Sequence, residues 1–129
     1  MRTLGILLLV FFSTNLSAAT FAERVAIAKK IESQQATQDY FLKGLFPVIG
    51  PVMGGIMKEC LSHPDASVEK FTLVANVAES GQLMDIDVEP KSNNTAACFA
   101  KAFATLTAPP PTLCERGVLP IVIDMRVTP

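Results

Sequence analysis

Three segments in the second half of the chain alternate between apolar and polar residues. The odd positions are apolar in 71–77, the even positions in 83–89, and the odd positions again in 121–127. The polar positions between them include Asp85, Asp87, Glu89, Asp124 and Arg126. A period of two is typical of strands with one buried and one solvated face. We therefore predict antiparallel strands at 71–77, 83–89 and 118–127, with a tight hairpin at Ser80-Gly81.

Helical patterns precede these strands. Residues 20–46 predict a helix with a bend in its Gln-rich middle, and Pro47 is expected to end it. Pro51 suits the first turn of a second helix that runs to about Leu61. The residues expected on its core-facing side are Val52, Ile56 and Cys60.

A further helix is predicted between the second and third strands. Asn93 and Asn94 are both suitable N-caps, and the prolines at 109–111 end the helix. Its apolar stripe consists of Ala96, Phe99, Ala100, Phe103 and Leu106. The order helix, helix, strand, strand, helix, strand predicts an α+β fold of two layers, in which helices pack on a three-stranded antiparallel sheet.

The first nineteen residues have the features of a cleavable secretory signal. Arg2 precedes an apolar run at 4–12, and small residues occupy 17–19, where a signal peptidase reads the chain. The apolar run is shorter than the roughly 20 residues that span a bilayer. We expect 1–19 to be removed and 20–129 to form one domain in the periplasm or outside the cell; an uncleaved anchor is the alternative.

Few residues in the chain suggest catalysis or metal binding. The formal net charge is −1 and neither sign clusters, so we expect no nucleic-acid partner. His63 is the single histidine; with Cys60 it supplies two metal ligands, fewer than a zinc site needs. A nucleophile pair of His63 with Cys114 has no supporting motif, and the acidic residues of 83–89 fit a solvated strand face. We therefore expect no enzyme activity, no metal and no cofactor.

The stretch Phe71–Pro129 resembles the C-terminal periplasmic domain of TolA and, more loosely, of TonB. The resemblance rests on an ordered set of features: the first strand, the Ser80-Gly81 turn, the strand Leu-Met-Asp-Ile-Asp-Val, the helix with Ala97-Cys98-Phe99, the prolines, and the closing strand. It divides the domain into a helical segment at 20–46 and a TolA/TonB-like part at 47–129. In those families the domain binds partner proteins, in part through a sheet edge that accepts an extended peptide.

Two of the three cysteines are expected to pair in an exported protein. Cys60 shares a helix face with core residues, and Cys98 lies beside the inward Phe99. The resemblance implies a disulfide that reaches Cys98. We predict the pair Cys60–Cys98, with Cys98–Cys114 as the alternative; Cys114 is then a free or intermolecular thiol.

The expected function is that of a small exported, non-enzymatic protein-binding module of the bacterial envelope. The alternative is a secreted inhibitor or virulence factor with an extracellular or host target. The residues expected to bind the unidentified protein partner at the edge strand are Ile121, Ile123, Asp124, Met125 and Val127. A second contact surface is the uncharged run 45–57, represented by Phe46, Val48, Ile49 and Met53. A weak contact with a membrane surface and a homodimer are both compatible with this run.

Overall fold

The order of elements in the computed structural model follows the predicted order, with the first helix divided into shorter pieces. The structure describes residues 19–112 and 117–128. The elements are α1 (Phe21–Glu32), α2 (Gln35–Asp39), the π-helix η1 (Tyr40–Leu45), α3 (Phe46–Leu61), β1 (Phe71–Ala78), β2 (Leu83–Glu89), α4 (Asn94–Phe103) and β3 (Val118–Met125). Residues 1–18 of the predicted signal segment 1–19, and Cys114, lie outside the described residues.

β1 is the central strand of an antiparallel sheet with the order β2-β1-β3. The predicted alternation of β1 is confirmed on its core side, where Phe71, Leu73, Ala75 and Val77 are buried. They pack under α4, whose Phe99 ring lies 5.9 Å from the Phe71 ring and 5.7 Å from the Phe103 ring. Asn93 is the N-cap of α4, and its side chain accepts a hydrogen bond from the Ala96 N–H over 2.9 Å.

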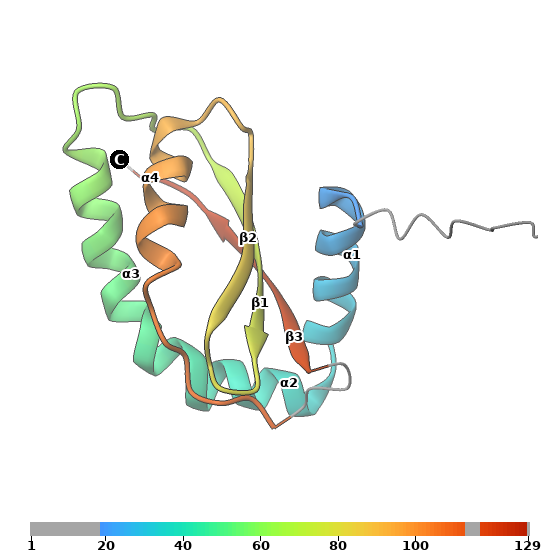
Figure 1. The fold of residues 1–129 in the computed structure, drawn as a ribbon. Helices are drawn as coiled ribbons and strands as arrows, with labels where there is room; N and C mark the ends of the chain where they lie inside the picture. The colour runs from blue at the N-terminus through green and yellow to red at the C-terminus, as the bar shows by residue number, and fades with distance from the viewer. Residues whose placement is uncertain (1–18, 113–116, 129) are drawn as a thin grey trace, which may run out of the picture.

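Helices lie on both faces of the sheet, so the prediction of two layers is wrong. Figure 1 shows α3 and α4 on one side of the strands and α1 on the other. Val74 points to the α1 side of β1 and is only 1% exposed, as is Ala28 of α1. An apolar residue at an even position of the central strand needs this second covering layer, because it would otherwise be exposed to water.

A β-bulge in β2 corrects the predicted alternation of that strand. Asn76 pairs with Met84 but Val74 pairs with Asp87, so β2 has one extra residue between these pairs, where Asp85 has φ 51°. Leu83 is consequently buried and Met84 is 37% exposed, the reverse of the expected pattern.

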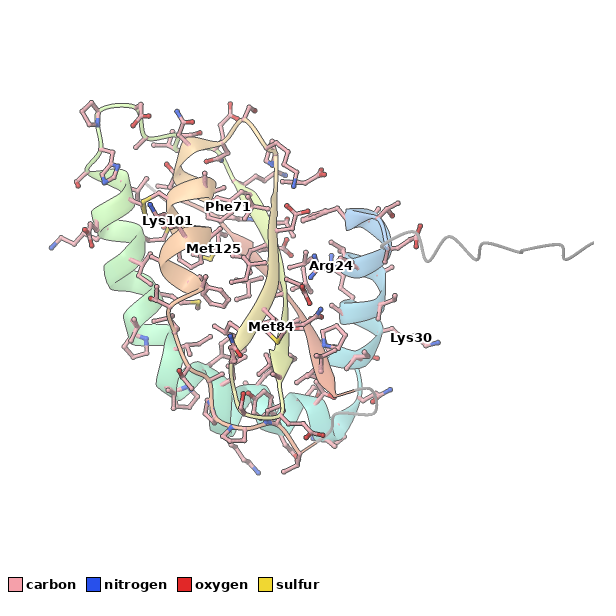
Figure 2. The ribbon with its side chains drawn as sticks, in the orientation of Figure 1. Arg24, Lys30, Phe71, Met84, Lys101 and Met125 are labelled. Carbon is pink, nitrogen blue, oxygen red and sulfur yellow. A yellow bond between two sulfur atoms is a disulfide. The ribbon has the colours of Figure 1, made fainter. Side chains whose placement is uncertain are left out.

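The bulge is also where α1 reaches across the sheet. The Arg24 guanidinium donates to the Asp85 carbonyl oxygen over 2.5 Å. Figure 2 shows Arg24 extending from α1 toward the strands. This contact ties α1 to β2, the strand farthest from β3, so α1 spans the sheet.

Pro47 does not end a helix, contrary to the prediction. Helical structure is continuous over Gln35–Leu61, and Pro47 lies in the first turn of α3. The π-helical turns of η1 come directly before it, and the Phe46 N–H bonds to the Phe41 carbonyl oxygen five residues back. A wider turn relieves the clash between a proline ring and the carbonyl four residues earlier. The expected bend is present at Ser33-Gln34, between α1 and α2.

A disulfide joins α3 to α4. The Cys60–Cys98 pair has a Cα–Cα distance of 5.8 Å and a sequence separation of 38, which confirms the predicted pairing. Cys60 is 2% exposed, as its expected position on the core face requires. Val52 is expected on the same face but is 45% exposed, so that part of the prediction is wrong.

The hairpin turn between β1 and β2 leaves no space for a side chain. Gly81 has φ 89°, and its N–H donates to the Ala78 carbonyl oxygen over 2.8 Å. A Cβ atom at this residue would lie 1.9 Å from the Ala108 carbonyl oxygen. Both the positive φ and the close backbone therefore require glycine.

Loss of the disulfide should destabilise the fold. For a separation of 38, chain-entropy arguments give about 4 kcal/mol, and removal of native disulfides from small exported domains costs about 2–5 kcal/mol. Cys98→Ser should lower the free energy of unfolding by that amount in urea denaturation. Cys114→Ser is the matched control and should leave the midpoint nearly unchanged. A negligible shift for Cys98→Ser would contradict the pairing.

Gly81→Ala should destabilise the protein by about 1–3 kcal/mol, because it combines a strained φ with a displaced backbone. Gly117 is the control, since it also has a positive φ of 76° but has nothing within 4 Å of an added Cβ. Gly117→Ala should therefore cost less than Gly81→Ala in the same thermal unfolding experiment. Equal costs would mean that the contact with Ala108 is unimportant.

Candidate functional site

β3 is an edge strand. It pairs with β1 along its whole length, from Phe71↔Met125 to Ala78↔Val118. Within residues 19–112 and 117–128 no other strand pairs with it. α1 is the helix that makes extensive contact with β3, and it lies on one face of the sheet (Figure 1). The outer edge of β3 is therefore a candidate binding surface.

The hydrogen bonds of the hairpin show which backbone groups of β3 face outward. The Ala78 N–H donates to the Gln82 carbonyl oxygen over 2.9 Å, so the backbone groups of Ala78 face β2. In a central strand, the backbone N–H and C=O groups of successive residues point alternately to its two neighbours. The backbone groups of the odd residues of β1 therefore point to β3. The outward groups of β3 consequently belong to Val118, Pro120, Val122 and Asp124.

Pro120 divides this edge into two unequal parts. It has no N–H, and an outward position is where an edge strand tolerates proline. The edge before Pro120 therefore cannot offer a continuous row of donors to another strand. Residues 122–128 contain no proline, and β3 itself ends at Met125.

The side chains expected at this edge fall into three groups. Ile121 is 1% exposed and belongs to the core, so it is unavailable for contact through its side chain. Ile123, Met125 and Val127 are half-buried and pack against the core from its rim; Figure 2 shows Met125 on the α4 side of the sheet. Asp124 is exposed on the opposite face, where one of its carboxylate oxygens accepts a hydrogen bond from the Thr72 hydroxyl over 2.7 Å.

β2, the other edge strand, is less accessible at its start. Gln82 forms an isolated bridge with Thr107, and the Ala108 N–H donates to the Gly81 carbonyl oxygen over 2.8 Å. The segment after α4 therefore occupies this end of the β2 edge. The bulge at Asp85 further disrupts the regular backbone that strand pairing needs.

Two acidic residues of β2, Asp85 and Asp87, have structural partners. The Asp85 carboxylate accepts from the Asn76 amide over 3.0 Å, and Asp87 forms an ion pair with Lys91. Partial burial acts to raise the pKa of Asp87, but the Lys91 ammonium and the Val88 N–H outweigh it and hold this pKa below its ordinary value. No group of three or more potential metal ligands occurs among the described residues.

A shallow depression lies beside the disulfide, between α3 and α4. Its lining includes Glu59, His63, Lys101 and Thr105. His63 is exposed, and its imidazole makes no hydrogen bond or ion pair within the part of the chain that the structure describes. The pairing of His63 with Cys114 considered from the sequence falls outside the described residues.

The second predicted contact surface is only partly exposed. Phe46 and Val48 are 40% and 50% exposed, whereas Ile49 is 1% exposed and Met53 packs against the core, so these two do not contribute an open surface. Leu42, 69% exposed, precedes the predicted run 45–57 and is not part of the predicted surface. Val52, 45% exposed, lies within the run but is expected on the core-facing side.

The continuous helix that carries this surface, Gln35–Leu61, is long and apolar enough to cross a membrane by length and composition alone. Of the most apolar 18-residue stretch of this helix, 22% is buried within the described structure. Core helices of soluble proteins and signal sequences meet the same criterion.

No protein-family model, curated protein or solved structure matches this chain. The resemblance to TolA and TonB therefore stays a prediction.

Replacing Asp87 should change the pH dependence of stability. A lowered pKa in the folded state adds stability above the unfolded pKa of about 3.9, and this stability is lost as the pH falls through the folded pKa. The ion pair is solvent-exposed, so Asp87→Asn should cost no more than about 1 kcal/mol at pH 7. The difference from the unsubstituted protein should shrink as the pH falls below the unfolded pKa and disappear at a low pH, where Asp87 is protonated in both states.

Urea denaturation at pH 7 and at low pH measures this difference. Glu89→Gln is the matched control, because it removes a carboxylate from the same strand that makes no hydrogen bond among the described residues. A cost for Asp87→Asn that persists unchanged at low pH would rule out an electrostatic origin.

Proposed function

We propose that this chain is a non-enzymatic protein-binding module that recruits a partner segment by strand addition at the outer edge of β3. The observation that carries the proposal is the set of outward backbone groups at Val122 and Asp124, on a strand with no neighbour on that side among the described residues. A partner strand gains main-chain hydrogen bonds at such an edge, and its alternate side chains are read by the flanking surface.

The surroundings of the edge support the proposal. Ile123, Met125 and Val127 leave apolar surface at the rim of the core, which an added strand would remove from water. The order β1, β2, α4, β3 is also consistent with the expected TolA/TonB-like arrangement, in which extended peptides bind at a sheet edge. That arrangement is part of the proposal.

The disulfide supports a location in an oxidising compartment. Disulfides persist in the bacterial periplasm and outside cells and are rare in the cytosol. Together with the signal features of the first nineteen residues, this favours a protein exported to the envelope or the medium.

Asp124→Pro should abolish partner binding and preserve the fold. The Asp124 N–H faces outward, so a proline at this residue removes a donor from the open edge and none from the β1 pairing. The measurement is a capture experiment with envelope proteins, using the exported protein and the variant side by side. Thermal unfolding of the variant should remain cooperative, with a modest loss from the broken Thr72–Asp124 hydrogen bond.

Two control variants separate binding at the edge from unfolding and from binding at the long helix. Ile123→Pro removes an N–H that bonds to β1 and should destabilise the protein by at least about 1–3 kcal/mol. Val52→Glu alters the exposed outer side of α3 and should leave binding unchanged. If Asp124→Pro captures the same proteins and Val52→Glu no longer captures them, the binding surface is on the helix and not at the strand edge.

A further inference from the structure

We infer that the outer edge of β3 binds a second copy of this chain, and this inference rests on the proposed function of that edge. The two copies would be related by a two-fold axis at Met125, with the β3 strands antiparallel. Charge complementarity, the place of Pro120 and the apolar rim each point to this register.

The outward backbone groups restrict the registers that two copies can adopt. Hydrogen-bonded pairs across the interface must join outward residues of both strands, which are the even-numbered ones in β3. β3 ends at Met125, so pairing that reaches Arg126 and Thr128 requires these residues to continue the strand with the same alternation. A two-fold axis at residue 123 places Pro120, which lacks an N–H, opposite Arg126 of the second copy, and earlier axes place it opposite outward residues closer to the centre of the pairing. In these registers each Pro120 leaves one hydrogen bond of the paired region unmade.

The charges at 124 and 126 select among the remaining registers. An axis at Asp124 sets two carboxylates opposite each other, and an axis at Arg126 sets two guanidinium groups opposite each other. An axis at Met125 instead sets Asp124 opposite Arg126 of the second copy, twice by symmetry. The paired region is then 122–128, and Pro120 lies outside it.

Both charged side chains are available for this contact. They are exposed, and neither forms an ion pair within the described part of this chain. The carboxylate oxygen of Asp124 that does not accept from Thr72 is free for a guanidinium donor. Arg–carboxylate pairs of this kind favour the matched register and disfavour like-charged ones.

The same register aligns the apolar rim of both copies. Met125 lies opposite Met125 of the second copy, and Ile123 lies opposite Val127. All three are half-buried at the edge of the core on the α4 side. Pairing buries their exposed parts and joins the two sheets into one with the order β2-β1-β3-β3-β1-β2.

A charge-exchange experiment tests the register in solution. Sedimentation velocity on the exported protein should show a concentration-dependent monomer–dimer equilibrium. Asp124→Arg and Arg126→Asp should each weaken the dimer at least about tenfold, because two attractive pairs become repulsive. A mixture of the two variants should dimerise again, since both cross-strand pairs of the mixed dimer are attractive. Circular dichroism verifies that each variant is folded.

Cross-linking provides a second readout of the same register. In a Cys114→Ser background, Met125→Cys should form an intermolecular disulfide under mild oxidation, because residues 125 of the two copies are directly opposite and closely spaced. Val122→Cys should not cross-link to itself, since residue 122 lies opposite residue 128.

The outcomes distinguish this inference from the proposed function. A monomer at the highest soluble concentration, or mixed charge variants that stay monomeric, would overturn the dimer. If Asp124→Pro still abolishes capture of another protein in that case, strand addition at the edge stands without self-association. If the unsubstituted protein does not dimerise and the Asp124→Pro variant still captures the same partners, both proposals fail.

Discussion

The Cys60–Cys98 disulfide is the connection on which the placement of the long helix depends. One side of the helix Gln35–Leu61 packs against the core, and its other side is apolar and exposed. Phe41, Leu45 and Ile49 hold its first part against the core, and the disulfide holds its end against α4. With both ends fixed, α3 and α4 form one layer over the core side of β1 (Figure 1), and no other described strand pairs with the outer edge of β3.

The local patterns of the sequence predict the elements but not all of their limits. The odd-position alternation of β1 and the stripe of α4 correspond to buried residues, because each side chain position depends on the period of its own element. The predicted helix end at Pro47 is wrong, because the π-helical turn that accommodates this proline is set by the preceding residues and their packing. The bulge at Asp85 is likewise decided by the pairing with β1 and by Arg24, from a distant helix.

The sequence does contain evidence for a helix layer on the second face of the sheet, but the alternating pattern of the strands made it hard to recognise. Val74 and Val122 are apolar at positions that a solvated sheet face would fill with polar residues, and Val74 is fully buried under α1. The sequence indicates only weakly that β3 is an edge strand, because strand order depends on which strands pair. Pro120 is the one residue that indicates an edge, since a proline in a central strand removes a ladder hydrogen bond.

An open strand edge is a hazard for a protein, because any exposed strand can add to it. Here Pro120 interrupts the first part of the edge, and the opposite charges of Asp124 and Arg126 restrict the second part to strands with matching charges. A second copy of the chain satisfies that restriction and would protect the edge in the absence of a partner. Self-association and partner binding then compete for the same backbone groups. The apparent affinity for a partner should consequently decrease as the concentration of this protein rises, because a partner strand must displace the second copy.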